Sequence, residues 1–185
     1  MFGGFGRLLR CRMTWGAAVL TLGLPTSALA DTLSVTATGT IGSSCSIAVK
    51  TAFPAANLGA SGSVAASADI GCNAKFKLNA TSTNGSMKAS GAAAPGFSNT
   101  IPYSLSVSVP IDQGGAISAT CPATQLVAGQ SACALSPLNA TGLSSVNGTA
   151  VSQIASLTAA WTLPTVKLIA GAYSDTITLL IATLP

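Results

Sequence analysis

The sequence predicts an all-β protein, a sandwich of short strands, and two observations carry that prediction. Apolar and polar residues alternate with period two in one segment after another, which is typical of strands that bury one face. Between these segments lie stretches rich in Gly, Asn, Ser and Pro, the residues that tight turns require. No stretch after residue 30 has the apolar periodicity of a helix.

The first thirty residues have the layout of an export signal. Three arginines form a positive head, residues 15–24 form an apolar middle, and residues 28–30 read Ala-Leu-Ala, a small-residue cleavage site. The apolar run is too short to span a bilayer, which takes about 20 residues. We therefore expect residues 1–30 to be a signal peptide, and the mature, exported chain to begin at Asp31.

The first predicted strand covers residues 31–41, DTLSVTATGTI, and has no hairpin partner beside it. Its apolar or small positions are Leu33, Val35, Ala37, Gly39 and Ile41. Further period-two segments follow at residues 43–50, 64–72, 75–81, 101–110, 156–164 and 174–184. The clearest is 101–110, where five large side chains alternate with one proline and three serines. Turn-rich stretches separate them at residues 53–63, 83–99, 110–115 and 141–149, at the intervals that a sandwich of short strands needs.

The composition excludes most catalytic and metal-binding designs. The chain contains no His and no Glu, and its four aspartates are scattered. General acid–base catalysis, nucleophilic serine and zinc sites usually draw on these missing residues, and no calcium-loop spacing is present. We therefore predict that the protein is not an enzyme and has no cofactor or metal. A hydrolase would need an unusual Ser–Lys or Asp arrangement.

Charge gives no sign of a nucleic-acid partner. The three arginines leave with the signal, and five lysines then face four aspartates, so the mature chain carries a net charge of about +1. Basic patches with interleaved aromatics are typical of nucleic-acid binding, and the sequence has none.

Four cysteines remain after the signal: Cys45, Cys72, Cys121 and Cys133. An even number in an exported protein indicates disulfides. Four cysteines allow three pairings, and we favour Cys45–Cys72 with Cys121–Cys133 because these close the shortest loops.

Four features of this sequence are shared with a known family. A cysteine follows the alternating segment that ends at Ile41, a second cysteine ends a predicted strand, and the sequence Ile101-Pro102-Tyr103 opens another. The C-terminal strand has a G-x-Y-x-D start and alternating aliphatics, at Gly171, Tyr173, Asp175, Ile177, Leu179 and Ile181. With these motifs the chain resembles the spore coat protein U domain and the archaic chaperone–usher fimbrial pilins.

The resemblance implies an incomplete, immunoglobulin-like pilin sandwich over residues 44–185 that lacks one strand. It also implies that residues 31–43 are a donor-strand extension, whose alternating side chains from Leu33 to Ile41 enter the groove of a neighbouring subunit. Such a protein is a structural subunit of a surface fimbria that supports adhesion or biofilm formation. Its partners are copies of itself or related pilins, a periplasmic chaperone and an outer-membrane usher.

Other interpretations are open at this point. Residues 32–41 are also compatible with the first strand of the chain's own domain. The same family contains minor or tip adhesive subunits, and secreted coat proteins that assemble without an usher. In each case the protein is exported through the periplasm to the extracellular surface and is not inserted in a membrane.

Overall fold

The computed structural model describes residues 38–185. The chain divides into two units, Met1–Gly39 and Thr40–Pro185, and the strands described below belong to the second. The predicted signal peptide, and Leu33, Val35 and Ala37 of the predicted first strand, lie outside the described residues. Within residues 38–185 the regular elements are β-strands and one 3₁₀ turn, η1 (Ala123–Gln125), which confirms the all-β prediction.

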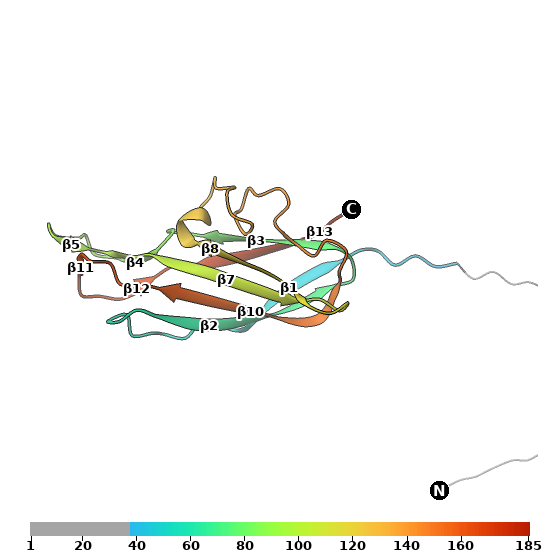
Figure 1. Cartoon of the computed structure of the whole chain (residues 1–185), viewed down its shortest axis with the longest axis horizontal. Helices are drawn as coiled ribbons and strands as arrows, with labels where there is room; N and C mark the ends of the chain where they lie inside the picture. The colour runs from blue at the N-terminus through green and yellow to red at the C-terminus, as the bar shows by residue number, and fades with distance from the viewer. Residues whose placement is uncertain (1–37) are drawn as a thin grey trace, which may run out of the picture. The chain divides into compact units, whose positions relative to one another are not determined.

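One layer is a five-stranded antiparallel sheet with the order β1-β2-β10-β7-β8 (Figure 1). Its strands are β1 (Cys45–Thr51), β2 (Gly62–Cys72), β7 (Tyr103–Pro110), β8 (Ala116–Pro122) and β10 (Ala150–Trp161). β2 and β10 are its longest strands, and β10 lies at its centre between β2 and β7. β1 is therefore an edge strand on one side of this sheet, and β8 is the edge strand on the other.

The other layer is a smaller antiparallel sheet in the order β13-β3-β9. Its strands are β3 (Phe76–Ser82), β9 (Leu143–Ser144) and β13 (Ile177–Thr183). On the β9 side, loop carbonyls continue the hydrogen bonding of β3: Leu135 O accepts from Ala80 N–H at 2.7 Å and Leu126 O from Ser82 N–H at 2.8 Å. The other side of β3 pairs with β13, which is the edge strand of this layer.

Short strands extend the sandwich at one end. A three-stranded antiparallel sheet contains β12 (Tyr173–Ser174), β4 (Met87–Ala89) and β6 (Thr100–Ile101), in that order. Beside it, β5 (Phe97–Ser98) pairs in parallel with β11 (Lys167–Leu168). Because β4 follows β3 in the chain and β12 precedes β13, this sheet continues the smaller layer.

The core lies between the two layers and follows from the period-two patterns. In β7, Leu105, Val107 and Val109 are buried while the serines between them face outward. Phe76 and Leu78 of β3 meet them from the opposite layer in the same apolar cluster. In the strand predicted at residues 101–110, burial thus follows the alternation of the sequence residue by residue.

Both disulfides have the predicted pairing. Cys45–Cys72 joins the start of β1 to the end of β2, with a Cα–Cα distance of 4.2 Å. Cys121–Cys133 joins the end of β8 to the loop that covers β3, with a Cα–Cα distance of 5.9 Å. Disulfides of this kind persist in oxidising compartments, as the prediction of an exported protein requires.

Several strand boundaries differ from the sequence prediction. β10 begins at Ala150 and not at residue 156, because a bulge near Ser152, whose φ is 57°, interrupts the alternation. β8 was not predicted, since the side chains on its inner face are small apart from Ile117. Residues 83–99, predicted as turns, contain β4 and β5. Residues 38–44 form no strand in the chain itself.

Candidate functional site

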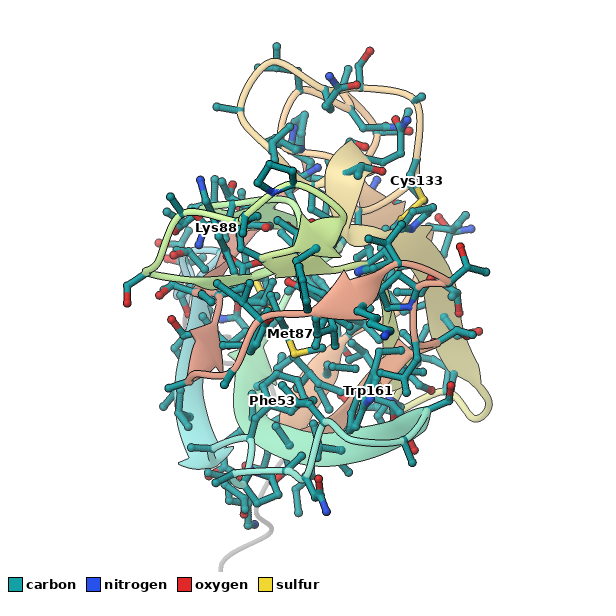
Figure 2. All side chains as sticks on the ribbon, turned by 90° about the vertical axis from the view of Figure 1, so that its left-hand side faces the viewer. Phe53, Met87, Lys88, Cys133 and Trp161 are labelled. Carbon is teal, nitrogen blue, oxygen red and sulfur yellow. A yellow bond between two sulfur atoms is a disulfide. The ribbon has the colours of Figure 1, made fainter. Side chains whose placement is uncertain are left out.

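A hollow extends from the space between β1 and β13, the edge strands of the two layers, to the loop at residues 53–58. It consists of two adjoining parts with volumes of about 640 and 430 Å³, which share Phe53, Asp175 and Ile177. The larger part lies toward Trp161 and the smaller part along β1. We call the two parts together the edge groove. Figure 2 looks at the end where the larger part opens, with Phe53, Met87 and Trp161 around it.

Both walls of the edge groove have free strand edges. Among residues 38–185, β1 pairs only with β2, and β13 pairs only with β3. Cys45 lies opposite Cys72, and Thr183 lies opposite Phe76, only four residues further along the chain. The start of β1 and the end of β13 are therefore at the same end of the sandwich. The two edges run antiparallel to each other with the hollow between them.

The side chains along the groove face the core but remain uncovered. Val49 of β1 pairs with Ala68, which is 3% exposed, yet Val49 itself is 78% exposed. Ile47 pairs with the buried Ile70 and is only half-buried. By contrast, every core-facing residue of β7, a strand in the interior of the same sheet, is buried. The apolar core is thus incomplete along this seam.

The opposite wall of the groove has the same property. Every second residue of β13 points toward the core and is half-buried: Ile177, Leu179 and Ile181. Their partners on β3 are buried: Ser82, Ala80 and Leu78. One additional strand laid in the groove would cover these rows of side chains and would pair with a free strand edge.

The wide end of the groove is aromatic. Four of the six aromatic residues in the described part of the chain line it: Phe53, Tyr103, Trp161 and Tyr173. Hydrogen bonds fix the polar groups of two of these side chains. Trp161 Nε1–H donates to Ala60 O at 2.9 Å, and Tyr173 O–H donates to Ile169 O at 2.9 Å. The rings therefore present fixed apolar surfaces to the hollow.

A carboxylate lies where the two parts of the groove meet. Asp175 lies in the two-residue connection between β12 and β13. Its Oδ1 accepts hydrogen bonds from the backbone N–H groups of Asn84 (3.0 Å) and Thr176 (2.8 Å). Its Oδ2 accepts from Ser82 Oγ–H at 2.5 Å and from Tyr103 O–H at 2.6 Å. Tyr103 belongs to the other layer, so this bond joins the two sheets across the groove floor.

The environment of Tyr103 favours its neutral form. Burial raises the pKa of the phenol above its ordinary value of about 10, and the hydrogen bond to Asp175 and the charge of that carboxylate raise the pKa further. The Tyr103–Asp175 bond therefore persists at neutral pH as a charge-assisted brace between the layers.

The structure distributes the predicted site residues over two places. The C-terminal motif lies along the groove, where Gly171, Tyr173, Asp175, Ile177 and Leu179 line its wall. Ile181 continues the same row toward the end of β13. Of the predicted donor positions, Gly39 and Ile41 are described; both are exposed, Ile41 to 92%.

Sequence reasoning missed part of the groove lining. Phe53 and Leu58 lie in residues 53–63, which the sequence predicts only as a turn-rich connection. Two large apolar side chains among Ala, Gly and Ser are the signal that marks this segment as more than a linker. Met87 was likewise assigned to a turn.

Comparisons with protein-family models, curated proteins and solved structures found no match to this chain. In residues 38–185, no helix has the length and apolarity needed to cross a membrane. The same residues contain no cluster of three or more His, Cys, Asp or Glu side chains placed to bind a metal.

Proposed function

We propose that this protein is a structural subunit of a surface fimbria that polymerises when one copy inserts a strand into the edge groove of the next. The observation that carries the proposal is the 78% exposure of Val49, a core-facing residue, beside a row of half-buried aliphatics on β13. Uncovered core and unpaired edges are an aggregation hazard in an isolated chain. An inserted strand reduces that hazard by pairing with a free edge and covering the apolar side chains beside it.

The donor in this proposal is residues 31–41 of a neighbouring copy. This segment has as many residues as β2, the 11-residue strand that runs the length of the sandwich. Its alternating positions, Leu33, Val35, Ala37, Gly39 and Ile41, form one apolar face that matches the apolar floor of the groove. Each large aliphatic side chain buried there contributes roughly 1.5–3 kcal/mol, and each net ladder hydrogen bond roughly 1 kcal/mol.

The family resemblance supports the same proposal from a different side. Its motif residues from Gly171 to Leu179 line the groove, which is where a pilin of this type accepts its donor strand. On this basis the fold is an incomplete immunoglobulin-like sandwich, residues 31–43 are the extension, and residues 44–185 are the domain. A periplasmic chaperone fills the groove before assembly, and an outer-membrane usher exports the subunits to the cell surface. The role is structural and not enzymatic.

A paired substitution on the donor tests the proposal. Val35→Asp with Ile41→Asp places two charges on the face that enters the groove, so fibres should be absent from the cell surface by electron microscopy. The matched control, Ser34→Asp with Thr40→Asp, adds the same charges to the opposite face and should leave fibres intact. Normal fibres from the Val35/Ile41 variant would refute the donor assignment.

A further inference from the structure

β8 ends the five-stranded sheet on the side opposite β1, and no strand of residues 38–185 pairs with its outer edge. Its register with β7 is unbroken over seven consecutive residue pairs. Edge strands are usually protected from association by charged side chains, bulges or proline. β1 has two of these devices, Lys50 and a bulge after Val49. β8 has no charged side chain and no bulge, and its only proline, Pro122, is its last residue.

The hairpin that joins β7 to β8 shows which backbone groups of β8 point outward. Ile111 N–H donates to Gly115 O at 3.2 Å, and successive pairs in an antiparallel ladder alternate between bonded and non-bonded. Counted along the register from this bonded pair, the odd-numbered residues of β8 bond to β7. The even-numbered residues Ala116, Ser118 and Thr120 therefore direct their N–H and C=O groups toward the free edge.

Two contacts describe the far end of this edge. Ser106 Oγ lies 2.7 Å from Thr120 Oγ1, which agrees with a non-bonded pair, because side chains are closer in such pairs. Cys133 Sγ lies 3.6 Å from Thr120 O, so the loop after η1 approaches that carbonyl. Ala116 and Ser118 are exposed, and the edge is most open there.

The open edge is complementary to itself. When a second β8 lies antiparallel about a two-fold axis at Ser118, Ser118 faces its own copy and Ala116 faces Thr120. The two Ser118 residues exchange two hydrogen bonds, and each Thr120 N–H donates to an Ala116 carbonyl. On the inner face, Ile117 meets Ala119, a large side chain against a small one. Both are half-buried at the margin of the core in the single subunit, and pairing covers them.

Charge also favours a second copy as the partner. β7 and β8 contain no charged residue, so two identical edges meet without repulsion. We propose that β8 is a docking edge for a second copy of this chain, in antiparallel pairing centred on Ser118. This inference goes beyond the proposed function, because β8 lies on the other side of the sheet from the edge groove.

The strength of this pairing depends on how many edges act together. Two isolated subunits associate weakly through a few hydrogen bonds, because association costs translational and rotational freedom. Subunits joined in a fibre present many β8 edges at once, and their pairings reinforce one another. The expected consequence is that fibres adhere side by side, while dilute single subunits do not form stable dimers.

Disulfide trapping tests the pairing on the purified, exported chain. In a hydrogen-bonded antiparallel pair the Cα atoms are about 5.5 Å apart, a distance that a disulfide bridges. When copper phenanthroline oxidises the protein, Ser118→Cys should therefore run as a dimer on a heated, non-reducing gel, and reductant should return it to monomer. Ser156→Cys is the matched control, because Ser156 is also an exposed serine of this sheet but lies on β10, two strands from the edge. It should stay monomeric.

Two more variants test the register. Ala116→Cys and Thr120→Cys should each stay monomeric alone, since neither residue faces its own copy, and should form a dimer when mixed. Equal cross-linking of the single and mixed proteins would overturn the inference. No more dimer from Ser118→Cys than from Ser156→Cys would also overturn it and leave the edge to a different partner. Heating separates strand-exchanged polymers but not disulfides, so this result stands or falls independently of the proposed function.

Discussion

Val49 offers the sharpest test of the acceptor side of the groove. Because it is 78% exposed in the subunit, replacing it by Asp removes little buried surface, and we expect the free energy of unfolding to change by only about 0.5 kcal/mol. In the assembled fibre the inserted strand covers this position. The variant then loses most of the roughly 1.5–3 kcal/mol that a fully buried valine contributes.

The aspartate also becomes desolvated in the filled groove, at a cost of several kcal/mol when no partner is present. Since about 1.4 kcal/mol is a factor of ten, a loss of about 3 kcal/mol or more weakens subunit association at least about 100-fold. Size-exclusion chromatography of purified subunits during assembly measures this directly. Val49→Asp should stay monomeric.

Leu180→Asp is the control for this experiment. Leu180 is 66% exposed and lies on β13, but it points away from the groove, opposite Asn79. Both variants introduce the same charge at an exposed apolar position of an edge strand. Leu180→Asp should assemble at the wild-type rate, and equal assembly of Val49→Asp would refute the reasoning that the groove holds a strand.

Two further predictions concern the body of the sandwich. The pKa of Tyr103 is raised, so its ionisation favours the unfolded state; the resulting stability is present below pH 10, the ordinary range of tyrosine, and is lost as the pH rises above it. Denaturant unfolding at increasing alkaline pH should therefore show a decline that Tyr103→Phe flattens, and an identical decline in that variant would contradict the assignment. Removing the second disulfide by Cys121→Ser with Cys133→Ser frees the loop whose carbonyls pair with β3. Unfolding free energy should fall by about 3 kcal/mol on the loop-closure model, and an unchanged midpoint in urea would contradict it.

The sequence predicts strands best where one face is packed along its full length. β7 is the example, because its large side chains meet both neighbouring strands and the opposite layer, so burial follows the alternation residue by residue. The disulfide pairing could also be predicted from the sequence, since each bond closes a short loop. The predicted strand at residues 156–164 covers only part of β10. The bulge near Ser152 adds a residue, so the inward-facing positions before and after it do not follow one period-two pattern.

The groove could not be predicted from local patterns alone. Its two walls come from the two ends of the domain, and only the fold places Ile47 near Leu179. The brace from Tyr103 to Asp175 likewise joins residues 72 positions apart. Alternation predicts which side chains of β1 and β13 face inward, but it does not show that residues 38–185 leave them partly uncovered.

The most direct test of the central claim is a denaturing gel of protein sheared from the cell surface, run with and without heating. Subunits joined by inserted strands are held together without covalent bonds, by backbone hydrogen bonds and buried side chains. We expect these contacts to survive in the unheated sample and to be lost when heating unfolds the subunits. The account predicts a ladder of multiples in the unheated sample that collapses to one monomer band after heating. A monomer band in both samples would contradict it, and would assign residues 32–41 to the first strand of their own domain.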